Sequence, residues 1–179
     1  MGLSVILVVI FRETFFRRVN PGWLENSLRV IGLFAMFLGQ LIRVSARGYK
    51  SEYSKNSHAL IEGGPYQIVR NPMYLGILLI GFGVVLMLFN WWVVILFLLI
   101  FASRYLPLIL SEEKKLRGMF PGAYEAYCGR VPRIMPRLAS LIKADARKYL
   151  PIKPAWFKKE INSIIALLVV VLLFFIWRR

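Results

Sequence analysis

Apolar residues in this chain come in long blocks that are separated by short basic stretches. Residues 30–42 and 161–177 carry no charge, and residues 74–110 carry only Arg104. A helix needs about 20 predominantly apolar residues to cross a bilayer, and Lys or Arg at its ends can extend a shorter block by snorkelling. The pattern therefore predicts an all-α integral membrane protein, a helical bundle with about four to five transmembrane helices.

The longest apolar block predicts a helical hairpin. Residues 74–110 are far too many for a single crossing. Asn90 stands in the middle of the block beside two tryptophans, which are typical of a membrane interface. We expect one helix over residues 74–89 and a second over residues 91–110, joined by a tight turn.

Two spacing patterns predict how helices pack. Gly32, Ala35 and Gly39 recur at intervals of three and four, so small residues share one face of a helix and let a second helix approach closely. Gln40, near the same end, is expected to face protein. A later stripe has the spacing of an apolar helix face, which Pro121 would kink or interrupt. That stripe consists of Leu116, Phe120, Tyr124 and Tyr127.

The two ends of the chain differ in character. Residues 1–11 are apolar but too short for a full crossing, so we expect a short or tilted span. Residues 138–159 are basic and carry Trp156 near their end, as expected of a segment that lies on an anionic membrane surface. Residues 161–177 are predicted to form a last span.

The net charge of +15 in 179 residues is informative through the positions of the charged residues along the chain. The basic residues gather beside the apolar blocks, notably in residues 47–70 and 111–159, which the hairpin places on one side of the membrane. This distribution follows the positive-inside rule and favours anionic headgroups over nucleic acid as a partner. We therefore expect that side, and any active site on it, to face the cytoplasm.

The chain contains one cysteine, Cys128, and one histidine, His58. A single cysteine excludes an intrachain disulfide and a CxxC metal pair, and a single histidine disfavours a zinc site or a Ser-His-Asp triad. We predict no metal site, with His58 an ordinary loop residue and Cys128 a packed small residue. Catalysis would have to rely on carboxylates, Arg, Tyr, the backbone and a bound cofactor.

A polar loop with unusual backbone chemistry precedes the hairpin. Gly63 and Gly64 free the backbone for close approach to a ligand, and Arg70 offers a free fork for a carboxylate or phosphate. Asn71 and Pro72 are typical of a helix start, where unpaired N–H groups can hold an anion. Alternatively, the block is a loop that caps a membrane helix, with Arg70 among the headgroups.

Charged residues also follow the hairpin. Glu112 and Glu113 oppose the basic trend around them, so a carboxylate here could hold a ligand ammonium; alternatively they pair with basic neighbours on a solvated helix. Arg104 lies inside a predicted span, where Arg is typically functional or paired unless it snorkels. Arg130 and Arg133 lie in a proline-restricted, extended stretch that suits a flap over a charged ligand or simple headgroup binding.

Read together, these blocks resemble the membrane methyltransferase superfamily of isoprenylcysteine carboxyl methyltransferases and phospholipid N-methyltransferases. The family pattern is Gly-Pro-Tyr, Val-Arg-His-Pro-x-Tyr, a helical hairpin, Glu-Glu-x-x-Leu, and then Phe, paired Tyr and Val-Pro-Arg. The match covers about residues 28–136 and rests on order and spacing. It is carried by Gly64-Pro65-Tyr66, Val69-Arg70-Asn71-Pro72-Met73-Tyr74, Glu112-Glu113-Lys114-Lys115-Leu116, Phe120, Tyr124, Tyr127 and Arg130-Val131-Pro132-Arg133.

The resemblance implies S-adenosylmethionine as methyl donor, bound at the cytosolic end of the hairpin. The loop would line one side of the pocket and the acidic pair the other, with one acid meeting the cofactor's ammonium. By position, the cofactor residues would be Gly64, Pro65, Tyr66, Arg70, Asn71, Tyr74, Glu112 and Glu113. A methyltransferase-like domain would then span residues 1–136, and residues 137–179 would form a basic interfacial segment and a last helix.

The resemblance also implies a membrane-embedded lipidic acceptor, either a phospholipid amine or an isoprenylcysteine carboxylate. Arg104 or Arg133 would hold its anionic group, and Glu112, Glu113 or a Tyr would help to deprotonate an amine. Asn71 stands where the family usually has His, and Asn can hydrogen-bond but cannot titrate. Two alternatives stay open: methylation of a small hydrophobic thiol or amine, and an inactive membrane scaffold or lipid-binding protein that keeps the fold.

Overall fold

The computed structural model describes residues 22–54, 60–136 and 149–177. Within these ranges the chain is helical, without strands, which confirms the predicted all-α fold class. The expectations for residues 1–11, for His58 and for residues 138–148 lie outside the described residues. The helices are α2 (Trp23–Tyr53), the 3-10 turn η1 (Gly64–Gln67), α3 (Pro72–Leu88), α4 (Trp92–Met119), α5 (Ala123–Arg130), α8 (Pro154–Phe157), the 3-10 turn η2 (Lys158–Glu160) and α9 (Ile161–Trp177).

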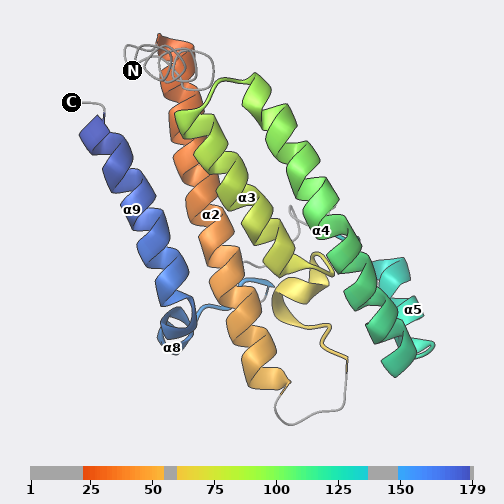
Figure 1. Cartoon of the computed structure of the whole chain (residues 1–179). Helices are drawn as coiled ribbons and strands as arrows, with labels where there is room; N and C mark the ends of the chain where they lie inside the picture. The colour runs from red at the N-terminus through yellow and green to blue at the C-terminus, as the bar shows by residue number, and fades with distance from the viewer. Residues whose placement is uncertain (1–21, 55–59, 137–148, 178–179) are drawn as a thin grey trace, which may run out of the picture.

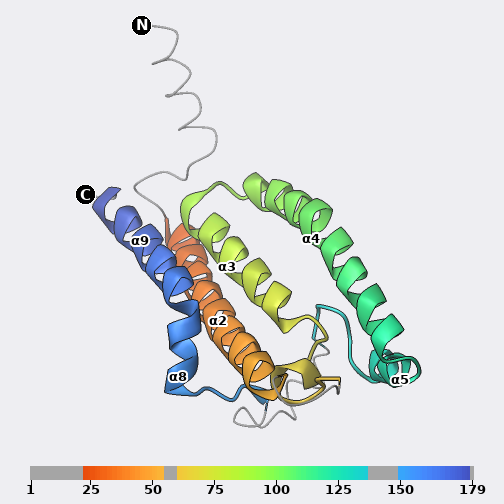
Figure 2. The ribbon, with the colours of Figure 1, turned by 60° about the horizontal axis from the view of Figure 1, so that its bottom comes forward.

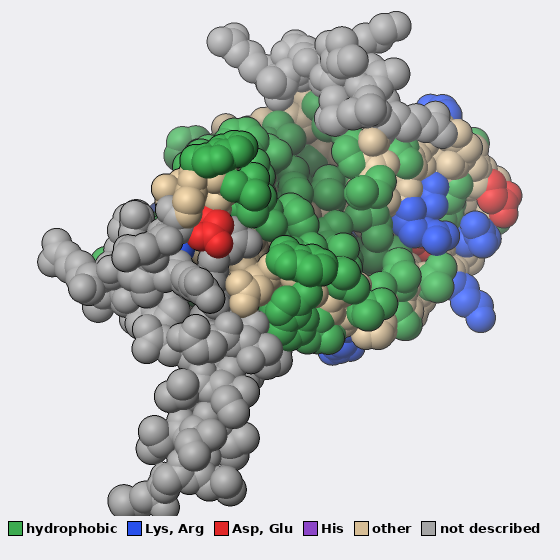
Figure 3. Space-filling model, turned by 90° about the horizontal axis from the view of Figure 1, so that it is seen from above, with side chains coloured by type: hydrophobic (Ala, Val, Ile, Leu, Met, Phe, Trp, Pro, Cys, Tyr) green, Lys and Arg blue, Asp and Glu red, His purple; other side chains and the backbone are tan. Residues whose placement is uncertain are grey.

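Four long helices stand side by side in the order α9, α2, α3 and α4, and the short α5 and α8 lie at the end opposite the α3–α4 turn (Figures 1 and 2). By length and composition α2 and α4 can each cross a bilayer, while α3 and α9 are shorter apolar helices. Large apolar side chains such as Phe34, Leu99 and Leu168 are exposed on the outer faces. Figure 3 looks onto one end of the bundle, where hydrophobic side chains cover much of the described surface. The chain is therefore a membrane protein.

The contact between α2 and α3 is made through glycines. A Cβ added at Gly39 would lie 2.7 Å from the carbonyl oxygen of Gly76, and a Cβ added at Gly32 would lie 2.7 Å from the carbonyl oxygen of Gly83. The two backbones therefore touch at two levels, without room for side chains between them. This close approach confirms the packing predicted from the small-residue spacing in α2.

The predicted hairpin is confirmed, but its second helix is longer than expected. The turn between α3 and α4 falls where it was predicted, whereas α4 runs to residue 119 instead of residue 110. The residues after 110 are mainly Glu, Lys, Leu and Arg, which favour a helix, so polarity ends the apolar stretch without ending the helix. The helix stops at Phe120, just before Pro121. Glu112 and Glu113 therefore project from a rigid helix.

The break at Pro121 separates the apolar stripe into two helices without dispersing it. Gly122 adopts a φ of 76°, a left-handed conformation that favours glycine, and α5 starts at the next residue. Tyr124 and Tyr127 are buried on α5, where Leu116 and Phe120 pack against their cluster. The stripe thus holds α5 against the end of α4.

α2 also extends further than expected, and the tail packs against its C-terminal end. The sequence analysis assigned residues 47–70 to the polar stretch before the hairpin, but α2 continues to Tyr53 and takes up the first part of it. Trp156 lies against Gly48, where any Cβ would collide with the indole ring, and its Nε1 donates a hydrogen bond to Glu52 Oε2 at 3.1 Å. Trp156 is only 5% exposed, so this residue packs inside the protein instead of lying on the membrane surface, whereas Phe157 beside it is 37% exposed.

A buried acid fixes the start of α9 on α2. The carboxylate of Glu160 accepts hydrogen bonds from Arg43 Nη2 at 3.1 Å and from Arg47 Nη1 at 2.9 Å. Three residues later, Ser163 Oγ donates to Gln40 Oε1 at 3.1 Å, and Gln40 is buried, as predicted. The C-terminal helix is therefore an integral part of the bundle.

Candidate functional site

Glu113 is the centre of a buried polar cluster at the end of the hairpin. Its side chain is only 6% exposed, and its carboxylate joins three segments that are distant in the sequence. Oε1 accepts hydrogen bonds from Arg70 Nε and from Asn71 Nδ2, both at 3.1 Å. Oε2 accepts a hydrogen bond from Arg133 Nε at 3.1 Å. The acid therefore ties α4 to the loop before α3 and to the segment after α5.

The guanidinium of Arg70 is fully engaged within the protein. Besides Glu113, it donates through Nη1 to the carbonyl oxygens of Val131 at 2.7 Å and Cys128 at 3.2 Å. Burial disfavours the charge of Arg70, but the hydrogen bonds to Glu113 outweigh this and raise its pKa. The guanidinium that the sequence analysis expected to be free for a ligand is thus occupied by groups of the protein. Its positive charge holds the cluster together.

The predicted flap lies against the start of α3. The backbone N–H of Arg70 donates to the carbonyl of Pro132 at 2.8 Å, and that of Asn71 donates to the carbonyl of Arg133 at 3.1 Å. Asn71 is the N-cap residue of α3, but its side chain makes no cap hydrogen bond and instead binds Glu113 and the Arg133 carbonyl. The side chain of Arg133 remains 44% exposed, which leaves donors available to a ligand.

Glu112 differs sharply from its neighbour. It is exposed, and the protein contact of its carboxylate is a hydrogen bond from Tyr74 Oη to Oε1 at 2.9 Å. The ring of Tyr74 lies 5.8 Å from that of Tyr105, centroid to centroid. Glu112 therefore presents an open carboxylate beside an aromatic wall, at the polar end of the helices.

The glycines of the loop approach an aromatic ring of the protein. Gly64 has a φ of 58°, and a Cβ there would lie 2.8 Å from Tyr49 Cδ2, while a Cβ at Gly63 would collide with the Tyr49 hydroxyl. The close approach expected for a ligand is thus made to Tyr49. Pro65 is buried in η1, and the carbonyl of Tyr66 accepts a 2.6 Å hydrogen bond from Tyr127 Oη.

The tyrosines near the cluster are held in the neutral form. Burial raises the pKa of Tyr124 to about 12, with Glu113 adding to the effect. Burial likewise raises the pKa values of Tyr66 and Tyr127 well above that of a free phenol. These phenols therefore stay protonated near neutral pH and are unsuited to act as bases there.

A polar cavity of about 450 Å³ opens beside the loop. Its walls include Gly63, Tyr127 and an ion pair between Arg130 Nη2 and Glu62 Oε2 at 2.8 Å. The sequence analysis missed Glu62 and Gln67 as lining residues, although both directly flank the Gly-Gly-Pro-Tyr motif. This volume lies within the roughly 300–1,000 Å³ typical of small-molecule sites.

Arg104 stands apart from the cluster. It is exposed on α4 and, within the described residues, takes part in no hydrogen bond or ion pair with the site. Of the candidate residues, the structure therefore gathers Arg70, Asn71, Glu113 and Arg133 around one carboxylate. Tyr74 and Glu112 form a second contact beside it.

Comparison with known proteins gives this arrangement its context. A model of the family described as "Phospholipid methyltransferase" matches residues 26–123, which include all of α3 and α4, the acidic pair and most of α2. Protein-S-isoprenylcysteine O-methyltransferase B of Arabidopsis thaliana is 30% identical over 142 residues, covering 75% of this chain and 71% of that protein. No solved structure matches the chain significantly.

Two bacterial relatives carry other names. The cobalt-zinc-cadmium resistance protein CzcN of Cupriavidus metallidurans is 29% identical over 75% of this chain and 62% of its own length. The nickel-cobalt-cadmium resistance protein NccN of Alcaligenes xylosoxydans xylosoxydans is 27% identical over 80% of this chain and 65% of its own length. The chain thus spans somewhat less than two thirds of these two relatives. Since the family match covers more than half of its residues, the chain belongs to the phospholipid methyltransferase family, as the sequence motifs predicted.

Proposed function

We propose that this protein transfers a methyl group from S-adenosylmethionine to a lipidic acceptor that reaches the site from the bilayer. The observation that carries the proposal is the open carboxylate of Glu112, held by Tyr74 at the polar end of apolar helices. Membership of the phospholipid methyltransferase family supports the reaction class. The Lys- and Arg-rich segments at this end support a cytoplasmic location of the site.

The residues present suit the cofactor. Its methionine end carries an ammonium and a carboxylate, for which the exposed Glu112 and the half-exposed Arg133 offer opposite charges. The polar cavity beside Gly63 offers room of small-molecule size. When bound, S-adenosylmethionine supplies a methyl group already activated by a sulfonium, so alignment and exclusion of water become the protein's main tasks.

Glu112 and Glu113 have different roles in this proposal. Glu113 is saturated by cationic and amide donors, so we assign it to positioning the loop, α4 and the Arg133 segment. A carboxylate acceptor needs no base. An amine acceptor would have to lose a proton, and Glu112, which this proposal assigns to the cofactor's ammonium, is not assigned to that step as well.

The contacts of Asn71 favour an active methyltransferase over the alternative of an inactive scaffold. Its side-chain amide donates to Glu113 and to the Arg133 carbonyl, so it performs a bridging task by hydrogen bonds alone. A residue in this place needs no titration to do so. The departure from the family's usual His therefore leaves the cluster intact.

Calorimetric titration of the detergent-purified protein with S-adenosylmethionine tests the proposal. We expect Glu112→Gln to weaken binding by roughly tenfold to a hundredfold, because a charge-assisted hydrogen bond to a charged group contributes about 1.5–3 kcal/mol. Glu125→Gln is the matched control: this exposed acid on α5 contacts Arg117 at 3.9 Å and should leave the affinity unchanged.

The outcomes separate the alternatives. Equal affinities for wild type and Glu112→Gln would contradict the assignment of Glu112. No binding in detergent or in nanodiscs would overturn both enzyme hypotheses and leave a lipid-binding scaffold. With binding in hand, transfer of labelled methyl into lipid extracts, compared with small hydrophobic thiols and amines, distinguishes a lipidic acceptor from a small one.

A further inference from the structure

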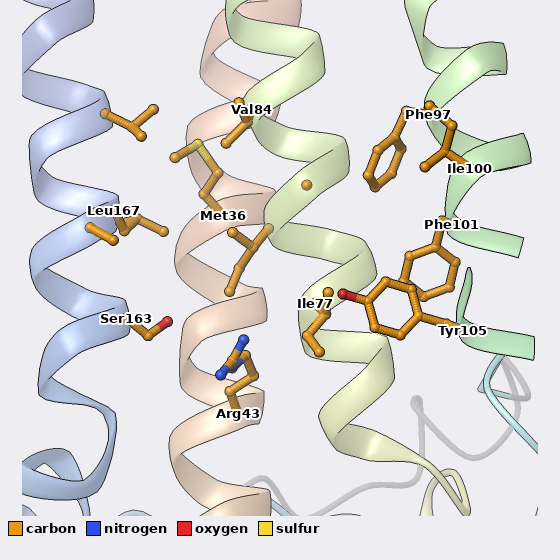
Figure 4. A pocket seen from close by; sticks show the side chains of 14 residues that line it. Met36, Arg43, Ile77, Val84, Phe97, Ile100, Phe101, Tyr105, Ser163 and Leu167 are labelled. Carbon is orange, nitrogen blue, oxygen red and sulfur yellow. The ribbon is translucent and has the colours of Figure 1, made fainter. Parts of the chain in front are cut away.

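A lateral cavity of about 320 Å³ lies on the outer face of α3, between α4 and α9. Its walls are almost entirely apolar, as Figure 4 shows for Ile77, Val84, Phe97, Ile100 and Leu167. The part of α3 that forms the floor of the cavity runs from Ile77 to Val84, which is about 10 Å at 1.5 Å per residue. The cavity is therefore a short apolar groove within the part of the bundle that the bilayer surrounds.

One wall of this groove is α9, which lies outside the family match that ends at residue 123. Its start is fixed by the buried Glu160, bound by Arg43 and Arg47, and by the Ser163–Gln40 hydrogen bond. Without this docking the groove would have α4 on one side only. The tail thus completes a groove that residues 26–123 of this chain form only in part.

The polar end of the groove carries an uncompensated charge. Among the described residues Arg43 and Arg47 share the single carboxylate of Glu160, so one positive charge remains there. Arg43 lines the groove, its Nε is buried with no hydrogen-bond partner among the same residues, and its side chain points toward the groove in Figure 4. An anionic group at this end would complete the hydrogen bonding of the guanidinium.

The groove also borders the candidate site. Tyr105 lines the groove, and its ring lies tilted by 58° against that of Tyr74, whose hydroxyl donates to Glu112. The side chain of Arg43 lies against Gly76, one helical turn after the start of α3. A molecule held in the groove therefore has its polar end close to the open carboxylate.

We propose that this groove binds one acyl chain of a phospholipid, with the phosphate at Arg43. The bilayer supplies this amphiphile at the open side of the groove. Its single phosphate charge matches the single excess charge of the Arg43–Glu160–Arg47 group. The proposal rests on the proposed function for its link to methyl transfer, but binding itself can be tested without turnover.

The test uses a phosphatidylethanolamine with a photoreactive diazirine in the half of one acyl chain nearer the headgroup, which is the part that a groove of about 10 Å can hold. The full-length protein in phosphatidylcholine nanodiscs, without S-adenosylmethionine, should give saturable adducts at Ile100 and Leu167, the groove residues of α4 and α9. Ala166→Phe should fill the groove and lower this labelling by about tenfold, which corresponds to 1.4 kcal/mol. Val169→Phe, an exposed position of α9 outside the groove, should change nothing.

A competition experiment on the wild-type protein tests the role of Arg43. Unlabelled phospholipid should displace the probe about tenfold better than diacylglycerol with the same chains, and Arg43→Lys should keep this preference, whereas Arg43→Gln should lose it. Equal competition in the wild type would overturn the assignment of the phosphate to Arg43. The wild-type comparison does not depend on the folding of any variant.

Three results would overturn the groove assignment. Adducts spread evenly over outward residues such as Leu99 and Leu168 would mean boundary lipid only. Labelling unchanged in Ala166→Phe would place the probe elsewhere. Saturable labelling by a prenylated cysteine probe but not by the phospholipid would assign the groove to a different amphiphile.

The proposed function and the groove can fail separately. Groove labelling without methyl transfer would refute the proposed function alone, and methyl transfer that survives Ala166→Phe would refute only the link between the groove and methyl transfer.

Discussion

Replacing Glu113 with Gln should destabilise the protein by about 3–5 kcal/mol, the cost of leaving a buried cation without its partner. Arg70 is the cation concerned, because its side chain is only 10% exposed and its strongest partner would lose its charge. The Gln amide would also direct its own N–H groups toward donors of Arg70, Asn71 or Arg133. The contacts that join α4, the loop before α3 and the segment around Arg133 should then weaken together.

Thermal and denaturant unfolding in one detergent measure this effect, with Glu112→Gln as the matched control. The same substitution one residue earlier removes an exposed acid with a single hydrogen bond from Tyr74, so stability should change by less than about 1 kcal/mol. Equal stability of the two variants would contradict the buried cluster. Arg70→Ala should disrupt the same cluster. This variant is therefore expected to lose cofactor binding whether or not Arg70 contacts the cofactor.

The contrast between these two acids marks the limit of the sequence analysis. The motif places Glu112 and Glu113 at the site, but it cannot assign their roles, because adjacent positions on a helix point about 100° apart and the decision depends on what packs on each side. Only the positions of Arg70 and Arg133 reveal that one acid is saturated and the other open. The sequence analysis therefore placed both acids in the candidate site without distinguishing the buried one from the exposed one.

The helices were predictable where the physical cause is local. Periodicity, the polar turn in the hairpin and the glycine spacing of α2 are properties of neighbouring residues, and each prediction was confirmed. Helix ends were less accurate, since the sequence analysis took the loss of apolarity as the end of a helix. The Arg43–Glu160 pair joins residues 117 positions apart, and no local pattern indicates it.

Placing Leu at Gly39 should separate α2 from α3 and cost about 3 kcal/mol, the upper part of the range for overpacked interiors. A Cβ at this position would already lie 2.7 Å from the Gly76 carbonyl oxygen and 2.9 Å from Leu79 Cβ. The obstacle includes backbone, which cannot rotate away as a side chain can. The start of α3 should therefore move, and with it the Tyr74–Glu112 contact.

Gly118→Leu is the control for this substitution, because a Cβ there meets nothing within 4 Å. Leu favours a helix more than Gly does, so this variant should gain roughly 0.5–1 kcal/mol, opposite in sign to Gly39→Leu. Unfolding measurements and S-adenosylmethionine titrations on both variants check the pair. If Gly39→Leu kept both its stability and its cofactor affinity, the backbone contact between α2 and α3 would not be what positions the site. Loss of both, with Gly118→Leu unaffected, would mean that the glycine contact sets the geometry on which Glu112 depends.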